Sequence, residues 1–225
     1  DASAQRLALI DDRGEPLASE QLACILALLA LRTAGSGTIV APVSASERLG
    51  RVVASQGGRL VLTRADTAAV VRAALRQGAL LGCDETGGFV WPAHLGAYDA
   101  MYTLLRTIAM LVEAEASLSD LRRELPSGSH LEREVACPWE FKGEVMRRLV
   151  ARHHGDRIDL TDGLKVDVGE GWVLVLPNAD RPSDRVIVST QDAARAEELL
   201  EQFVGEVTDT VARTGAPNAV PAGQV

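Results

Sequence analysis

Several features that would mark a function class are scarce in this chain of 225 residues. Its three cysteines, Cys24, Cys83 and Cys137, are widely spaced, which excludes a CxxC zinc site and disfavours a disulfide framework. Lys and Arg total 23 against 31 Asp and Glu, and the net charge of -8 disfavours a general nucleic-acid or anionic-membrane surface. Because free thiols are typical of a reducing compartment, we expect a cytoplasmic protein. From the negative net charge we expect no nucleic-acid or membrane partner.

Long hydrophobic runs and common catalytic motifs are also missing. The most apolar stretch, LACILALLALRTAG from Leu22, is shorter than the roughly 20 residues that a membrane-spanning helix needs, so it predicts a buried helix. No export signal, G-x-S-x-G, P-loop or dinucleotide fingerprint is found. A strand-like stretch follows Asp1 almost at once, which we interpret as the start of a piece cut from a longer protein.

The pattern of hydrophobic residues predicts five segments. In 36–125, the stretches TIVAPV, RLVLTR and ALLGCD read as strands that alternate with two helices, which is typical of a parallel α/β domain. Residues 126–136 are rich in turn formers and read as a linker. In 137–213, a helix, several short strands and a last helix predict a smaller α+β domain. Residues 1–35 read as a strand–turn–strand and the apolar helix, and 214–225 as a disordered tail.

Four stretches occur in the order and spacing of one known family. They are DASAQRLALIDDRG, GCDETGGFVWP, CPWEFKGEVMRRL and LTDGLKVDVGEGWVLVLPN. Together they resemble motifs of the α-D-phosphohexomutases, the phosphomannomutase/phosphoglucomutase family. The resemblance implies that 1–35 are the remainder of domain 2, 36–125 an α/β domain 3, and 137–213 a TBP-like α+β domain 4. It also implies that domain 1, with the phosphoserine, lies upstream, so we predict no catalytic residue in this chain.

The first stretch stands where the family has a metal loop, D-x-D-x-D-R. Only the first carboxylate is kept, as Asp1, while Ser3 and Gln5 stand at the other two positions. A hydroxyl and an amide bring no negative charge to a hard divalent cation, so Mg²⁺ affinity should fall steeply. Arg6, which closes the motif, is retained. We expect no cofactor, and Mg²⁺ only if this altered loop still functions.

The family's phosphate loop, R-P-S-G-T-E-P-x-x-R, corresponds to residues 176–185. Its leading arginine is a leucine here and its threonine is Asp180. Arg181 stands in place of the glutamate and Arg185 matches the final arginine, so these two cations are the remaining candidates for holding a phosphate. Because Asp180 and Asp184 lie among them and would repel an anion, the favoured interpretation is a surface turn of alternating charges.

The family's sugar loop, G-G-E-x-S-G, is better kept. Asp84 stands for its glutamate and Thr86 for its serine; the carboxylate could accept hydrogen bonds from sugar hydroxyls, and the Thr86 hydroxyl could donate or accept them. A hairpin turn that needs Gly87 and Gly88 for its backbone would show the same pattern. Both interpretations stay open.

The altered loops predict a phosphohexomutase-like module that has lost catalysis and is regulatory or structural in sugar-phosphate or nucleotide-sugar metabolism. It resembles the C-terminal part of mannose-1-phosphate guanylyltransferase-like fusion proteins. The alternatives are a fragment of an active mutase that interconverts hexose 1- and 6-phosphates, and a pure interaction scaffold. The expected partners are a hexose phosphate, upstream domains of the same protein, and a second copy of the chain or another protein chain. The last is expected because residues 1–35, as part of an incomplete domain, would expose a sheet edge.

Overall fold

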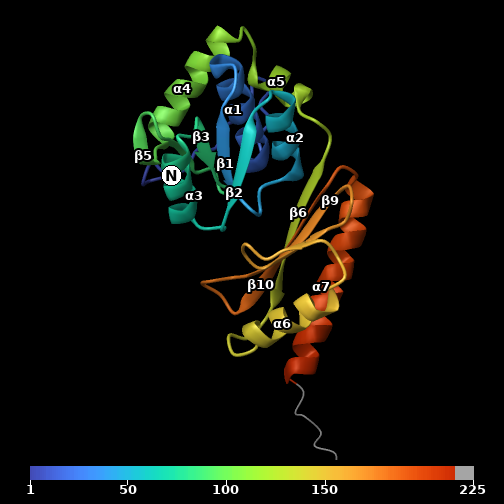
Figure 1. The fold of residues 1–225 in the computed structure, drawn as a ribbon. Helices are drawn as coiled ribbons and strands as arrows, with labels where there is room; N and C mark the ends of the chain where they lie inside the picture. The colour runs from blue at the N-terminus through green and yellow to red at the C-terminus, as the bar shows by residue number, and fades with distance from the viewer. Residues whose placement is uncertain (216–225) are drawn as a thin grey trace, which may run out of the picture. The chain divides into compact units, whose positions relative to one another are not determined.

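The computed structural model describes residues 1–215, and these divide into two compact units, with the boundary in the sequence between Gly128 and Ser129 (Figure 1). Each unit contains one five-stranded sheet. In residues 1–215, no helix combines the length and hydrophobicity that crossing a membrane requires. The tail predicted over 214–225 lies outside the described residues from 216 onward.

The first unit is a three-layer α/β fold, as predicted. Its sheet has the order β2-β1-β3-β4-β5, in which β1, β2 and β3 are parallel and β4 and β5 are antiparallel additions. The strands are β1 (Thr38–Pro42), β2 (Arg59–Thr63), β3 (Leu81–Cys83), β4 (Phe89–Trp91) and β5 (Leu95–Tyr98). The helices are α1 (Ser19–Ala34), α2 (Glu47–Ser55), α3 (Thr67–Gln77), α4 (Ala100–Glu113) and α5 (Leu118–Glu124).

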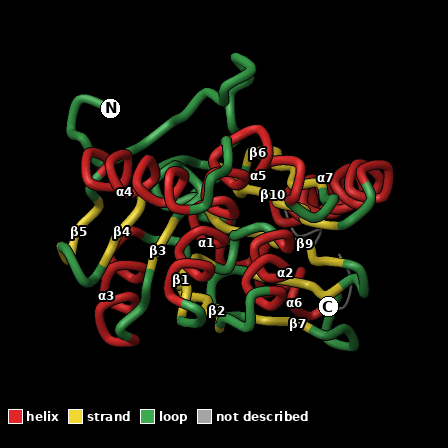
Figure 2. Tube along the Cα trace, turned by 90° about the horizontal axis from the view of Figure 1, so that it is seen from above, coloured by secondary structure: helices red, strands yellow, loops and turns green. Residues whose placement is uncertain are grey.

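The two faces of this sheet are covered unequally. Helix α3 packs on one face through a small cluster around Val70 and Ala74, against Val40 and Val90 of the sheet. The other helices cover the opposite face and enclose a much larger core. Figure 2 shows α3 and α4 on opposite sides of the strands.

Helix α1 lies inside the larger core. Every residue from Leu22 to Leu31 is buried, because the helix carries no charged side chain in that stretch and contacts α2, α4, α5 and β3. We predicted that residues 1–35 would be the remainder of a preceding domain. The structure instead places α1 in one compact unit with residues 36–128, so the predicted boundary at residue 35 does not divide the structure.

The predicted strand–turn–strand from Arg6 to Leu17 forms only in part. The turn is present, with Gly14 at φ 81° and the Asp11 carboxylate accepting hydrogen bonds from the N–H groups of Arg13 and Glu15. The flanking residues form an isolated bridge between Ile10 and Pro16 and no regular strands. Pro16 has no N–H to donate, which limits the ladder on the return leg.

The second unit is an α+β fold, also as predicted. Its sheet is antiparallel throughout, in the order β6-β10-β9-β8-β7. The strands are β6 (Ser129–Ala136), β7 (Ile158–Asp159), β8 (Leu164–Asp167), β9 (Gly171–Pro177) and β10 (Ser183–Thr190). Helices α6 (Lys142–Arg152) and α7 (Ala193–Gly215) pack on the sheet around Leu149, Leu199 and Phe203.

The linker predicted over 126–136 is wrong for most of its length. Residues 129–136 form the edge strand β6, which pairs with β10 from Ser129–Thr190 to Ala136–Ser183. Its alternating side chains explain the strand, because Val135 points into the core while Glu132 and Glu134 remain on the other face.

Candidate functional site

The sugar loop follows β3 and is organised by one carboxylate. Oδ1 of Asp84 accepts hydrogen bonds from the Thr86 N–H (2.8 Å), the Thr86 hydroxyl (2.8 Å) and the Gly88 N–H (2.9 Å). The two predicted sugar-binding side chains are therefore bonded to each other within the loop. Sequence reasoning left a sugar contact and a backbone turn open, and this geometry provides the turn.

The glycines of this loop allow another segment to approach. Gly87 has φ 87°, and a Cβ there would lie 2.6 Å from the carbonyl oxygen of Leu7. The Leu7 N–H donates to the Gly87 carbonyl (2.9 Å), and Arg6 forms a bridge with Gly88. The altered metal loop, residues 1–6, is thus joined directly to the sugar loop.

The altered metal loop folds around Asp1. Oδ1 of Asp1 accepts from the N–H groups of Gln5 (2.9 Å) and Arg6 (3.3 Å), and Oδ2 accepts from the Ser3 hydroxyl (2.8 Å). Ala4 has φ 53°, and its carbonyl accepts from the Ala100 N–H at the start of α4 (2.8 Å). The loop keeps its shape through backbone hydrogen bonds to its one carboxylate.

This donor set does not fit Mg²⁺. The cation prefers several charged oxygen ligands, and the three motif positions offer one carboxylate, one hydroxyl and one amide. Both oxygens of Asp1 already accept hydrogen bonds, so a cation would compete with the contacts that shape the loop. Within residues 1–215, no three His, Cys, Asp or Glu side chains are grouped closely enough to hold a metal.

The phosphate-loop segment forms the turn between β9 and β10 in the second unit. The Asn178 N–H donates to the Ser183 carbonyl (3.0 Å), and the Asn178 side chain accepts from the Asp180 N–H (2.9 Å). The Lys142 ammonium on α6 donates to the carbonyls of Asn178 and Arg181. Lys142 of α6 therefore stabilises the conformation of this turn.

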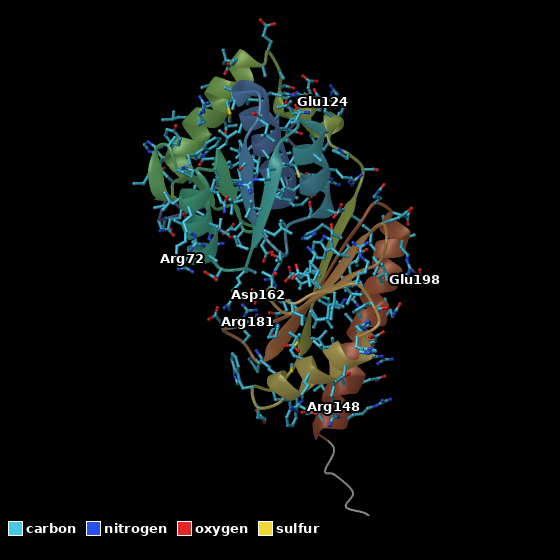
Figure 3. All side chains as sticks on the ribbon, in the orientation of Figure 1. Arg72, Glu124, Arg148, Asp162, Arg181 and Glu198 are labelled. Carbon is cyan, nitrogen blue, oxygen red and sulfur yellow. The ribbon has the colours of Figure 1, made fainter. Side chains whose placement is uncertain are left out.

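Both predicted phosphate-binding arginines face carboxylates of β6. The Arg185 guanidinium donates through Nε and Nη2 to the two carboxylate oxygens of Glu132, at 2.6 and 2.8 Å. Arg181, labelled in Figure 3, lies 3.4 Å from Glu134 through its Nη1. The hydrogen bond from Arg185 lowers the pKa of Glu132, against the opposing effect of partial burial. A phosphate that reached these arginines would have to compete with two carboxylates.

Asp184, between these arginines in sequence, points the other way. It is 0% exposed in the second unit. Burial raises the pKa of its carboxyl, while the Cys137 thiol and the Lys142 ammonium lower it. Asp184 therefore does not stand at the surface as the repelling charge that the sequence suggested.

The structure thus gathers the predicted residues into two groups. Asp1, Ser3, Gln5, Arg6, Asp84 and Thr86 come together in the first unit, and Arg181 and Arg185 share one turn and strand in the second. Sequence reasoning missed Glu132, Glu134 and Lys142. The alternation of polar and apolar residues in HLEREVA was a signal for the first two, since side chains two apart share a face of a strand.

Comparisons with known proteins agree with this architecture. Residues 18–128 match the family model described as phosphoglucomutase/phosphomannomutase, alpha/beta/alpha domain III. A protein of Methanopyrus kandleri named "probable phosphoglucosamine mutase" is 30% identical over 206 residues, covering 91% of this chain and 46% of the relative. A phosphoglucomutase/phosphomannomutase of Thermococcus kodakarensis is 26% identical, covering 89% of this chain and 44% of the relative.

Solved structures show the same fold. A phosphoglucomutase/phosphomannomutase family protein of Burkholderia thailandensis superposes with a TM-score of 0.77 at 19% identity, over 91% of this chain and 44% of that one. N-acetylphosphoglucosamine mutase of Aspergillus fumigatus, solved with GlcNAc-6P and magnesium, gives a TM-score of 0.68 at 12% identity, over 92% and 51%. The chain spans about half the length of these proteins. Residues 18–128 are therefore identified as the α/β/α domain III of the phosphoglucomutase/phosphomannomutase family, and the chain is similar over 91% of its length to a relative that carries a mutase name.

Proposed function

We propose that this chain is a non-catalytic phosphohexomutase module with a regulatory or structural role in sugar-phosphate metabolism. The observation that carries the proposal is the state of its charged groups. Arg185 is bonded through two nitrogens to Glu132, and Asp1 is bonded through both oxygens to its own loop. Groups that should meet a substrate phosphate and a metal are paired with neighbours instead.

Phosphoryl transfer makes demands that these loops meet poorly. A metal ion offsets the charge of the transferring group, and a cationic clamp holds the other phosphate. The first loop offers one carboxylate, and in the second unit each arginine faces its own glutamate. Because groups that act in one catalytic assembly do not contribute additively, losing several of them should leave little activity.

Weak recognition of a hexose phosphate is compatible with this role. The sugar loop forms a turn around the Asp84 carboxylate, and Thr86 is exposed beside it. Relatives named as phosphoglucosamine mutases make hexosamine phosphates natural ligands to try alongside mannose and glucose phosphates. The residues that would contribute are Asp84, Thr86, Arg181 and Arg185.

The test is a coupled mutase assay on the chain with Mg²⁺ and a hexose bisphosphate activator, using mannose, glucose and glucosamine phosphates. We expect no turnover, and the same result for a longer natural chain that contains these residues. Turnover by such a chain that Asp1→Ala abolishes would overturn the proposal. Isothermal calorimetry with each hexose phosphate then distinguishes two roles. A module that senses sugar phosphates should show saturable heat of binding, and a pure scaffold should show none.

The second candidate is that the chain is part of an active phosphohexomutase. Its support is the 30% identity over 206 residues to a relative that carries a mutase name. This candidate predicts robust turnover by the longer protein and a loss of that turnover in Arg185→Gln. A more specific form of the first proposal is that the module is attached to a sugar nucleotidyltransferase. A G-x-G-T-R-x-x-P motif in the sequence upstream of Asp1 would support this attachment, and its absence would contradict it.

A further inference from the structure

A concavity lies in the first unit, away from the metal and sugar loops. It has a volume of about 460 Å³, within the range of small-ligand pockets. Its lining includes Gly78 and Leu80, which lie just before β3, whereas the sugar loop follows β3. The pocket and the sugar loop are therefore at opposite ends of the same strand.

The wall of this pocket is largely apolar and aromatic. Trp91 and Tyr102 pack edge to face with ring centroids 6.2 Å apart, and His94 stacks on Tyr102 at 3.8 Å. The Trp91 indole N–H donates to the Thr103 hydroxyl (3.1 Å), which fixes the orientation of its ring. The wall is completed by small or aliphatic side chains of α1, α3 and the loop before β3. Such a surface is preformed, so a ligand would lose little energy in ordering it.

One cation lines this pocket, and it has no counter-charge. Arg106 of α4 is half-buried, and in residues 1–215 its guanidinium has neither a hydrogen bond nor an ion pair. The Thr33 hydroxyl, another polar group of the lining, already donates to Glu113 (3.3 Å). A half-buried guanidinium beside an apolar wall favours an anionic group, to which it can donate two parallel hydrogen bonds.

We propose that this pocket binds an organic monoanion with an apolar body, such as an aromatic carboxylate or sulfonate, with the anion on Arg106 and the body against Trp91 and Tyr102. A sugar phosphate fits poorly, because its hydroxyls would face a wall with few free polar partners. The site is thus distinct in place and in chemistry from the loops at the other end of β3.

Two dyes that share one aromatic body test the proposal. The probe 8-anilinonaphthalene-1-sulfonate carries one sulfonate, and N-phenyl-1-naphthylamine lacks it. Fluorescence titration of the 225-residue chain should give saturable 1:1 binding of the anionic dye. Arg106→Gln should weaken that binding at least tenfold and leave the neutral dye unchanged. Arg72→Gln, which removes an exposed arginine of α3 (Figure 3), should change neither.

A variant that fills the pocket separates it from exposed apolar surface elsewhere. Ala34, at the exposed end of α1, lines the rim, and Ala34→Trp should abolish binding of both dyes. In the unaltered chain, the anionic dye should also shift the Trp91 indole N–H signal in an NMR titration. Absence of saturable binding, equal affinity of the anionic dye for Arg106→Gln and the unaltered chain, or binding that survives Ala34→Trp would each overturn the proposal.

Discussion

The guanidinium of Arg185 on β10 holds the carboxylate of Glu132 on β6 through two hydrogen bonds of 2.6 and 2.8 Å. The two residues are 53 positions apart in sequence and come together only because β6 and β10 are paired. In register, Arg185 stands opposite Glu134, so its bond to Glu132 is diagonal. Arg185, a predicted phosphate-binding residue, is therefore bonded to a carboxylate of the same chain.

Removing that carboxylate's charge should expose an anion site. We expect Glu132→Gln to bind glucose 6-phosphate at least several-fold more tightly in calorimetry, because Arg185 no longer faces a competing anion. The stability cost should be about 1 kcal/mol or less, as for other partly exposed ion pairs. Glu201→Gln, which breaks the exposed pair with Arg133, is the control and should leave binding unchanged. No gain in Glu132→Gln would show that Arg185 is not available to phosphate.

The buried Asp184 should make stability depend on pH. Burial raises the folded-state pKa of this acid, so the folded state holds the proton more tightly than the unfolded state. Its contribution to the free energy of unfolding is therefore most favourable at low pH and falls as pH rises from the unfolded pKa through the folded one. Asp184→Asn should then stabilise the chain by about 1 kcal/mol at pH 7. Urea unfolding at pH 4 and pH 7 tests this, and an equal effect at both values would contradict it.

The sugar-loop turn should depend on Gly87. Gly87→Ala would place a Cβ 2.6 Å from the Leu7 carbonyl in a left-handed conformation, and we expect a loss of about 1–3 kcal/mol. Gly14 is the matched control, because it has φ 81° and open space around its Cβ position. Gly14→Ala should cost about 1 kcal/mol, from conformation alone. Equal losses in the two variants, measured by urea unfolding, would mean that the contact with Leu7 is unimportant.

We expect the metal loop to bind Mg²⁺ only when carboxylates are introduced at positions 3 and 5. We expect no saturable heat from millimolar Mg²⁺ in the unaltered chain, and saturable binding in Ser3→Asp/Gln5→Asp, because three carboxylates restore the donor set. The control Ser3→Asn/Gln5→Asn has side chains of the same size as the double aspartate variant but without their charge. It should behave like the unaltered chain. Binding of Mg²⁺ to the unaltered chain that Asp1→Ala removes would show that one carboxylate suffices.

The parts of the fold that follow from local pattern could be predicted from the sequence. The continuous apolar run identified α1 as a buried helix, and the alternation of strands and helices identified the parallel sheet. Strand β6 was missed because it follows directly on the turn formers Pro126, Ser127 and Gly128, which suggested a linker. The domain to which α1 belongs depends on which surfaces enclose it, and its own sequence does not contain that information.

The candidate site was predictable as a set of positions and less so as a set of contacts. Matching the sequence to family motifs located Asp84, Thr86 and Arg185, and the structure places the first two on one loop and Arg185 on β10, where a surface turn was expected. The bonds they make were not predictable, because pairing with Glu132 depends on strand register across 53 residues. The buried orientation of Asp184 likewise depends on the side of β10 that faces Cys137.

The burial of α1 from Leu22 to Leu31 links the parts of the first unit. Because α2, α4, α5 and β3 all contact α1, its stretch from Leu22 to Leu31 has no solvent-facing side from which it could unwind alone. Its backbone amides can then meet water only when the surrounding helices and sheet separate together. We therefore expect the first unit to unfold cooperatively, so that a substitution that destabilises one of the elements packed on α1 destabilises the others as well.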